Sequence, residues 1–376
     1  MRFTELPTPC YLIDENKIVQ NLAVLHDVAR RSGAKILLAQ KAFSMFSLYP
    51  LLAEYLDGST ASGLFEARLA SEHFPGETHV YSPAYAPDEF DEILQYADHI
   101  VFNSFNQWKI YGNLARAAGK SCGLRVNPEC STQPKEHAMY DPCGPTSRLG
   151  ITIANFQPEL LDGIEGLHFH TLCEQNSDDL VRTVAAFENR FGKYLKDMKW
   201  LNLGGGHHIT RDDYDVEVLV ECVKYLRGKY GVEVYLEPGE AVVLNAGYLV
   251  STVLEVMKNH AHIAILDTAA PCHMPDVLEV PYRPPVFRAA EGHKKAFTYT
   301  LTGRSCLAGD VIGEYSFDNM LRPGDQVTFE DMALYTMVKT NTFNGVPLPN
   351  IALRRADGTD EIVRTFGYED FKNRLS

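Results

Sequence analysis

Four short motifs along the chain end on residues whose types suit chemistry on an aldehyde. An apolar run that begins at residue 36 ends at Lys41, and another run ends at His170. Later runs end in a glycine triplet at 204–206 and at Glu237, within Glu-Pro-Gly. A lysine amine can form a Schiff base with an aldehyde if burial or neighbouring groups lower its pKa. We therefore expect Lys41 to be an imine-forming nucleophile.

The other three motifs supply what a phosphorylated pyridine aldehyde requires from a protein. Backbone N–H groups of glycines can approach a phosphate ester closely, because no side chain intervenes. A carboxylate such as Glu237 can pair with a pyridine nitrogen and make the ring an electron sink, and the His170 imidazole can stack on the ring face. These requirements together describe pyridoxal 5'-phosphate as the cofactor. The expected phosphate-binding glycines are Gly204, Gly205 and Gly206.

The elements that must position these residues alternate between strand and helix. Helical spacing of apolar residues is found at 106–118, 177–195 and 213–230, between runs typical of strands. The strand-like runs lie near 35–40, 55–60, 78–82, 98–103, 122–127, 164–170, 198–203 and 232–237. Eight repeats of this kind predict an α/β fold with a closed (β/α)₈ barrel over residues 10–245. The four motifs should then share one rim, because catalytic groups of such barrels lie at the C-terminal strand ends.

After about residue 246 the pattern changes to alternating and β-branched runs without long helices. This change predicts a second, C-terminal β domain, formed by residues 246–376 together with residues 1–9. The runs expected to be its strands are 248–257, 261–267, 296–302, 325–330, 333–338 and 361–366.

Composition and charge narrow the class of protein. The chain has 376 residues, is 45% hydrophobic and carries a net charge of -14, which disfavours nucleic-acid binding and attracts small cations. No apolar run approaches the roughly 18 residues of a membrane span, and residues 1–5 show no apolar signal core. The eight cysteines lack paired or CxxC spacing, so reduced thiols are expected. We expect a cytoplasmic protein that binds neither nucleic acid nor membrane.

Three features near the motifs leave alternatives open. His207 and His208, with Cys272, could suggest zinc, but CxxC and HExxH spacings are absent, so no metal is expected. His168 shares a strand face with His170 and is expected to be a buried, hydrogen-bonded neighbour. Arg125 ends the fifth expected strand, either beside the cofactor or in a plain ion pair at the rim.

The ordered motifs resemble those of the fold-type III pyridoxal-phosphate decarboxylases, the group of ornithine, arginine and diaminopimelate decarboxylases. The matching segments are Pro9-Cys10-Tyr11-Leu12, Ala39-Gln40-Lys41-Ala42, Ala61-Ser62-Gly63, His168-Phe169-His170, Gly204-Gly205-Gly206, Glu237-Pro238-Gly239, Arg304-Ser305-Cys306 and Ala333-Leu334-Tyr335-Thr336.

This resemblance implies a role for each matched residue. It implies that Lys41 carries the cofactor, that His170 stacks on its ring and that Glu237 pairs with its nitrogen. The glycine triplet and Tyr335 would hold the phosphate. Cys306 would return a proton to the product from the second subunit, which implies an obligate homodimer with shared active sites.

Within this group the chain is most similar to the enzymes that decarboxylate carboxynorspermidine or carboxyspermidine, which implies a role in polyamine biosynthesis. Relatives commonly carry arginine where Glu240 stands, and losing that cation argues against diaminopimelate as the substrate. A glutamate could instead meet an ammonium of a cationic carboxylated polyamine. We expect Glu240 and Asp276 to bind the polyamine tail, with Asp267 third, although each could also be a solvated loop acid. Cys173 replaces a serine that contacts the phosphate in relatives, so that contact is left open.

Other functions remain open on the same scaffold. Decarboxylation of diaminopimelate or another basic amino acid would use the same residues. A non-catalytic pyridoxal-phosphate carrier would also need Lys41, but such carriers are single barrels and the β domain counts against one. A racemase would need a second base opposite Lys41, for which Tyr335 is the matched candidate.

Overall fold

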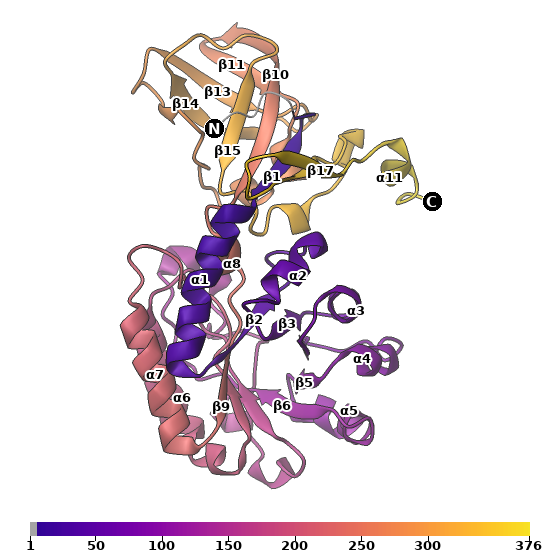
Figure 1. Cartoon of the computed structure of the whole chain (residues 1–376), viewed down its shortest axis with the longest axis vertical. Coiled ribbons are helices and arrows are strands. Elements are labelled where there is room, and N and C mark those ends of the chain that lie inside the picture. Colours follow the sequence, from indigo (N-terminus) through magenta and orange to yellow (C-terminus); the bar gives the residue numbers. More distant parts are fainter. Residues whose placement is uncertain (1–5) are drawn as a thin grey trace. The chain divides into compact units, whose positions relative to one another are not determined.

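The computed structural model describes residues 6–376 and divides the chain into two compact units (Figure 1). One unit is continuous and spans Gln20–Val242, and the other combines the residues up to Val19 with Val243–Ser376. Residues 1–5 of the segment assigned to the β domain lie outside the described residues.

The continuous unit is a closed barrel of eight parallel strands, which confirms the predicted (β/α)₈ fold. Every expected run from residue 35 to residue 237 overlaps one of these strands, and most of these runs are apolar, as strands buried on both faces of a barrel wall are. The strands are β2 (Lys35–Ala39), β3 (Gly58–Ala61), β4 (Glu77–Tyr81), β5 (His99–Phe102), β6 (Ser121–Arg125), β7 (Gly166–His168), β8 (Trp200–Asn202) and β9 (Glu233–Leu236).

Helices connect these strands and cover the barrel. Side chains cap three of them: Ser104 accepts a hydrogen bond from the Gln107 amide, Asn176 accepts one from the Ser177 amide, and Asp215 accepts one from the Val218 amide. The helices are α1 (Glu15–Ser32), α2 (Tyr49–Leu52), α3 (Leu64–His73), α4 (Phe90–Tyr96), α5 (Phe105–Ala117), α6 (Ser177–Phe191), α7 (Val216–Tyr230) and α8 (Glu240–Val243). Short 3-10 turns lie at Phe46–Leu48, Lys135–Tyr140, Ile153–Asn155, Pro158–Leu160 and Gly192–Asp197.

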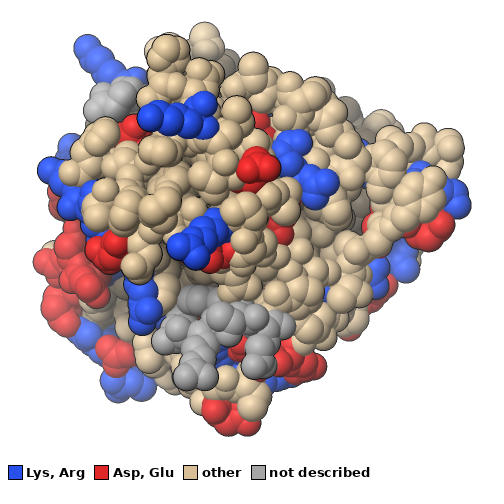
Figure 2. Space-filling view, turned by 90° about the horizontal axis from the view of Figure 1, so that it is seen from above, with Lys and Arg blue, Asp and Glu red and all other residues tan. Residues whose placement is uncertain are grey.

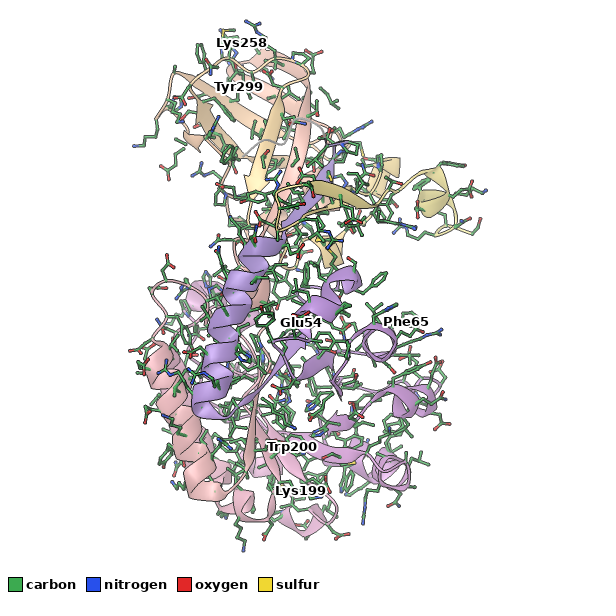
Figure 3. All side chains as sticks on the ribbon, in the orientation of Figure 1. Glu54, Phe65, Lys199, Trp200, Lys258 and Tyr299 are labelled. Atoms are coloured by element: carbon green, nitrogen blue, oxygen red, sulfur yellow. The ribbon has the colours of Figure 1, made fainter. Side chains whose placement is uncertain are left out.

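The barrel interior is filled around Trp200, a residue of β8 that is labelled in Figure 3. Its indole packs with Leu37, Val101 and Tyr235. Gly166, on the neighbouring strand β7, makes room for it, since a Cβ there would lie 2.0 Å from the indole ring. Packed side chains therefore close the middle of the barrel and leave the strand ends to carry the chemistry.

The second unit is built on a mixed sheet in the order β12-β14-β13-β11-β10-β1-β16-β17, with β15 also paired to β10. Its pairs are antiparallel except β1 with β16 and β11 with β13. The strands are β1 (Cys10–Asp14), β10 (Gly247–Asn259), β11 (Ala261–Leu266), β12 (Ala290–Glu291), β13 (Phe297–Thr302), β14 (Val311–Phe317), β15 (Gln326–Glu330), β16 (Asn350–Arg354) and β17 (Asp360–Arg364). The helices are α9 (Ala270–His273), α10 (Asp276–Glu279) and α11 (Tyr368–Lys372), with 3-10 turns at Met337–Lys339 and Phe343–Gly345.

Two details of this unit differ from the sequence-based expectation. Residues 10–14 were assigned to the barrel, but β1 pairs with β10 and β16 of the mixed sheet. The strand expected at 333–338 is wrong. Tyr335 adopts a left-handed backbone with φ +52°, and a 3-10 turn begins at Met337, so the segment cannot stay extended.

On the face drawn in Figure 2, lysine and arginine side chains are interspersed with acidic ones. Within residues 6–376, the helices are all too short or too polar to cross a lipid bilayer.

Candidate active site

The rim formed by the C-terminal strand ends brings together the four motifs of the barrel. Lys41 lies in the turn after β2, and His170 follows β7. The glycine triplet follows β8 and Glu237 follows β9. Two hydrogen bonds donated by backbone amides join the last three motifs: the Gly205 amide donates to His170 Nδ1 at 2.8 Å, and the Glu237 amide donates to the Gly204 carbonyl at 2.8 Å.

The Lys41 amine is set up to lose its proton more readily than an ordinary lysine. Burial within the barrel mouth lowers its pKa, and the guanidinium of Arg125 lowers it further. The nearby carboxylates of Glu237 and Glu240 act in the opposite direction without reversing the shift. The side chain is nevertheless open to solvent, so the amine combines access with a lowered pKa, which favours the unprotonated form that a nucleophile requires.

The His170 ring is held in one neutral form. Burial and the charges of Lys41 and Arg125 lower the pKa of this imidazole well below its usual range. Because its Nδ1 accepts a hydrogen bond from the Gly205 amide, the ring proton must lie on Nε2. The ring is thus a fixed, uncharged surface, which suits stacking on an aromatic cofactor.

The glycine triplet forms a tight turn that other residues cannot replace. Gly206 has φ +80°, and a Cβ there would lie 2.0 Å from the Leu172 carbonyl. Gly204 and Gly205 donate their amides to Asn202 Oδ1 and to His170. Among the hydrogen bonds of the described residues, the Gly206 amide has no acceptor, so the triplet offers one free N–H group rather than three.

Glu237 is a buried carboxylate whose orientation is set by groups on neighbouring strands. Asn202 donates through Nδ2 to Glu237 Oε1 at 2.7 Å. His168 places its Nε2 3.5 Å from the other oxygen, Oε2. Asn202 lies two residues before Gly204 on the same strand face, and that spacing was the signal in the sequence that could have identified it.

Arg125 contributes to the rim through the aromatic and carbonyl groups of its neighbours. Its guanidinium lies 4.6 Å from the centre of the Tyr81 ring and donates to the His170 carbonyl at 3.1 Å. Tyr81 in turn donates to Asn103 at 2.8 Å. Across residues 6–376 no carboxylate lies within ion-pair distance of Arg125, so the plain rim ion pair is not formed. Sequence patterns did not single out Tyr81 or Asn103, which carry no motif of their own.

Glu240 is buried beside the triplet and paired with His208, whose Nε2 lies 3.1 Å from Glu240 Oε2. The Arg211 guanidinium, which can only donate, lies 3.3 Å from His208 Nδ1. His208 therefore accepts at Nδ1 and donates from Nε2 to the glutamate. Cys173 lies close to this group, and burial followed by the charge of Glu240 raises the pKa of its thiol to about 12. Cys173 is thus a neutral thiol at physiological pH.

The remaining predicted site residues lie in the sheet unit, and their contacts are described within that unit alone. Cys306 is exposed, and its amide donates to Asn344 Oδ1 at 2.7 Å. Its loop is held by Asp310, which accepts hydrogen bonds from the amide and hydroxyl groups of Ser305. Tyr335 has a left-handed backbone, and the Lys339 amine lies 6.0 Å from its ring centre.

The two aspartates expected to bind the substrate tail already have partners. Asp276 Oδ1 lies 2.5 Å from the Lys339 amine, which neutralises its charge. Asp267 is buried and accepts a hydrogen bond from the Thr252 amide at 2.9 Å. Burial raises the pKa of the Asp267 carboxyl above its usual value. Neither carboxylate stands free to meet a cation.

Two clusters of imidazole and carboxylate groups are compact enough for a metal ion but are not arranged to bind one. At the opposite ends of the strands, Glu77, His79 and His99 place their donor atoms within 4.8 Å. The two imidazole planes lie only 13° from parallel, with ring centres 3.9 Å apart, so their in-plane lone pairs cannot converge on one ion. In the second cluster, Glu174, His208 and Glu240, both nitrogens of the imidazole are already used.

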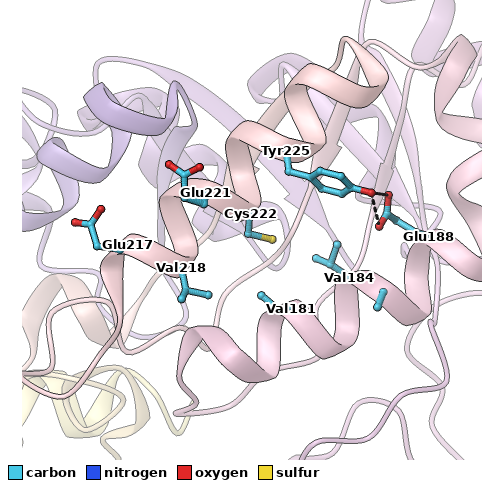
Figure 4. A pocket seen from close by; sticks show the side chains of 9 residues that line it. Val181, Val184, Glu188, Glu217, Val218, Glu221, Cys222 and Tyr225 are labelled. Carbon is cyan, nitrogen blue, oxygen red and sulfur yellow. Dashed lines mark hydrogen bonds between the residues drawn. The ribbon is translucent and has the colours of Figure 1, made fainter.

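A shallow groove outside the barrel, between α6 and α7, does not belong to this site (Figure 4). Its floor is apolar, with Val184 and Cys222 among the lining residues. The acids at its edge are paired within the chain: Glu188 with Lys229 and Tyr225, Glu217 with Arg31, and Glu221 with Lys224. No polar group remains there to select a ligand.

Comparisons with known proteins agree with this geometry. A family model described as pyridoxal-dependent decarboxylase, C-terminal sheet domain, matches residues 10–333. The carboxynorspermidine/carboxyspermidine decarboxylase of Campylobacter jejuni is 44% identical over 385 residues, covering 100% of both chains. The carboxyaminopropylagmatine decarboxylase of a Synechocystis species is 42% identical, covering 100% of this chain and 97% of its own. A crystal structure of carboxynorspermidine decarboxylase with norspermidine, from Campylobacter jejuni, is 43% identical with a TM-score of 0.92, covering 98% of this chain and 100% of that one.

Proposed function

The chain belongs to the pyridoxal-dependent decarboxylases with a C-terminal sheet domain, and we propose that it decarboxylates carboxynorspermidine and carboxyspermidine to norspermidine and spermidine. One observation carries this substrate choice, namely the 44% identity over both full chains to an enzyme named for these two substrates. The net charge of -14 also favours a cationic carboxylated polyamine as the substrate, because the protein attracts cations.

The residues of the barrel rim fit pyridoxal 5'-phosphate. Lys41 would hold its aldehyde, and the neutral His170 ring would lie against its face. The free Gly206 amide would bind its phosphate, joined by the hydroxyl of Tyr335 from the sheet unit. Glu237, oriented by Asn202, would pair with its ring nitrogen. The crowding that any Cβ would meet at the triplet supports this fit, because a bound phosphate needs close backbone approach.

When bound, the cofactor supplies an aldehyde that captures the substrate amine and a ring that accepts the electron pair left by CO₂. The protein supplies the groups around it. Lys41 provides an amine whose pKa is lowered by burial and by Arg125. The Glu237 carboxylate stabilises positive charge at the ring nitrogen, and the Cys306 thiol returns a proton to the substrate carbon.

Among the three acids, Glu240 is the first candidate to bind the cationic tail of the substrate. Its Oε2 is occupied by His208, and its second oxygen remains able to accept from an ammonium. Asp276 and Asp267 rank below it, because one is neutralised by Lys339 and the other accepts from a backbone amide. A homodimer in which Cys306 completes the partner's site, located in the cytoplasm, accounts for the exposed Cys306 and for the eight free thiols.

Carboxyaminopropylagmatine is a second candidate substrate. The enzyme named for it is 42% identical to this chain, nearly as similar as the first. Its substrate class likewise joins an amino-acid head to a cationic tail, so the same residues would serve.

A panel of substrates tests the proposal directly. Purified protein supplied with pyridoxal phosphate should release CO₂ fastest from carboxynorspermidine or carboxyspermidine. Carboxyaminopropylagmatine, diaminopimelate, ornithine and arginine complete the panel. Preference for carboxyaminopropylagmatine would move the assignment to the second candidate, and preference for diaminopimelate would refute both. A coloured protein that releases CO₂ from none of them would indicate a non-catalytic carrier.

A further inference from the structure

His168 is a fully buried histidine whose ring is not satisfied by the protein. The side chain is 2% exposed, and neither Nδ1 nor Nε2 has a hydrogen-bond partner among the described residues. Leaving a buried polar group without a partner costs free energy, so such a group needs an explanation. The position of His168 at the end of β7, two residues before His170, places it directly beneath the rim.

One polar group lies within reach of the His168 ring. The Nε2 atom is 3.5 Å from Glu237 Oε2, slightly longer than a hydrogen bond. The other oxygen of this carboxylate is already held by Asn202. The Tyr81 ring closes the remaining side of the imidazole edge-on, with ring centres 5.6 Å apart. Separations of this kind commonly shorten when a site binds its ligand.

The proton on His168 has one favourable position. A neutral imidazole carries a proton on either Nδ1 or Nε2, and Nδ1 faces no acceptor. A proton on Nε2 points toward the Glu237 carboxylate instead. Burial, followed by the charges of Arg125, His79 and Lys41, lowers the pKa of His168 well below its usual range, so the ring stays neutral. The carboxylate that faces the ring is Glu237, with Oε2 3.5 Å from Nε2.

We infer that His168 is a positioning residue that donates from Nε2 to Glu237 and, together with Asn202, fixes that carboxylate as the partner of the cofactor's ring nitrogen. The inference rests on the proposed function, because it assumes that Glu237 meets the pyridine ring. A merely structural histidine would fill the same space without a specific tautomer and without any response to the charge of Glu237.

Nitrogen NMR of the full chain, labelled on histidine and stripped of pyridoxal phosphate, tests the tautomer. We expect the His168 signal, identified by its loss in His168→Gln, to report the neutral Nε2–H form between about pH 6 and pH 9. Glu237→Gln should shift this signal. The matched control Glu240→Gln, which removes the charge of the neighbouring buried glutamate, should instead shift His208. A protonated ring, an Nδ1–H tautomer or an unchanged signal in Glu237→Gln would overturn the inference.

Pyridoxal phosphate binding by two variants of His168 tests whether its hydrogen bond to Glu237 supports the cofactor site. Glutamine places an N–H donor close to the position of the imidazole Nε2, whereas leucine fills the space without a donor. We expect His168→Leu to weaken cofactor binding by about 10- to 100-fold, the range for a hydrogen bond to a charged group, and His168→Gln to restore most of it. Equal binding by the two variants, both with wild-type thermal stability, would contradict the positioning role.

These arms also separate failure of this inference from failure of the proposed function. Wild-type protein that binds no pyridoxal phosphate would refute the proposed function. The NMR arm needs no cofactor and would still decide whether His168 donates to Glu237.

Discussion

Lys41 and Arg125 are two cations on one rim, and their proximity is unfavourable unless one of them gives up its proton. Arginine does not lose its proton at accessible pH. The lysine amine is therefore the group whose pKa is lowered. The contacts of Arg125 with the Tyr81 ring and the His170 carbonyl hold the guanidinium in place. The rim thereby lowers the pKa of this amine without a dedicated base.

Arg125→Gln should make the Lys41 amine harder to deprotonate. Removing the guanidinium takes away the second-largest cause of the lowered pKa, so the pKa of Lys41 should rise. The unprotonated amine exists above the pKa, and the pH at which it reacts should therefore move upward. The rate of capture of an added aldehyde near neutral pH should fall by roughly 3- to 10-fold, measured by absorbance across a pH series. Arg116→Gln, on an exposed residue paired with Asp162, is the control; an identical pH profile in both variants would refute the role.

Lys41→Ala should lose the covalent attachment of the cofactor. Reduction with borohydride followed by mass spectrometry should find the adduct on Lys41 in wild-type protein and on no residue in the variant. Release of CO₂ should fall by at least about 10³-fold, because substrate exchange and cofactor retention both depend on this amine. Lys109→Ala provides an exposed control. An adduct that persists in Lys41→Ala would show that another lysine holds the cofactor.

At the scale of elements, the turns after the strands carry as much of the site as the strands do. The turn after β8 relies on left-handed backbone at Gly204 and Gly206, and the close packing of Gly206 on the Leu172 carbonyl excludes a side chain. Gly206 is thus required twice, for its backbone conformation and for its free amide.

Gly206→Ala should destabilise the fold by roughly 2–4 kcal/mol, because an alanine there meets both an unfavourable φ and a steric clash. Denaturant unfolding of the cofactor-free protein measures this change. Gly228→Ala is the matched control, since Gly228 lies within α7 and a Cβ there meets nothing within 4 Å. The control should be neutral or stabilising by up to about 1 kcal/mol. Equal stabilities of the two variants would contradict this account of the turn.

The barrel could be predicted from the sequence because its strands are short apolar runs separated by helices of strong periodicity. The strand ends then placed Lys41, His170 and Glu237 on one rim without further information. Tyr81 could not be found in this way, and the spacing of Asn202 before Gly204 indicated its strand face but not its partner Glu237. Their roles depend on which side chains neighbouring strands bring beside them, and that pairing is set by the barrel register.

The mixed sheet was less predictable because its strands depend on distant partners. β14 and β16 were not expected; β14 contains Gly313, and β16 pairs with β1 from the other end of the chain. The segment 333–338 has the composition of a strand, yet the Tyr335 backbone turns it away. Local propensity is a weak guide where tertiary contacts decide the conformation.

At the scale of the whole molecule, the proposed active site requires two chains. Cys306 is exposed on the loop held by Asp310, as a residue that acts on a partner subunit would be. Lys41 belongs to the barrel unit and Cys306 to the sheet unit. If each site takes Lys41 from one subunit and Cys306 from the other, a dimer of one Lys41 variant and one Cys306 variant should contain one intact site.

Mixing Lys41→Ala with Cys306→Ala subunits should therefore restore activity that neither variant has alone. Random pairing makes half of the dimers mixed, and each mixed dimer contains one intact site of two, so about a quarter of wild-type activity should return. The measurement is CO₂ release after co-refolding, with pyridoxal phosphate binding by Cys306→Ala alone as the control for folding. Absence of any recovery, with mixed dimers verified by mass, would place both residues in the same subunit's site.

The sheet unit is discontinuous in the chain: β1 lies near the start and pairs with β10 and β16 from the far half. A ribosome makes the chain from its first residue onward, so β1 emerges long before either neighbour exists. The barrel segment Gln20–Val242 can close while synthesis continues, whereas β1 must wait for β10 on one edge and, longer still, for β16 at residues 350–354 on the other edge. The nascent protein is therefore most prone to aggregate in that interval. A truncation that removes β16 should leave one edge of β1 unpaired.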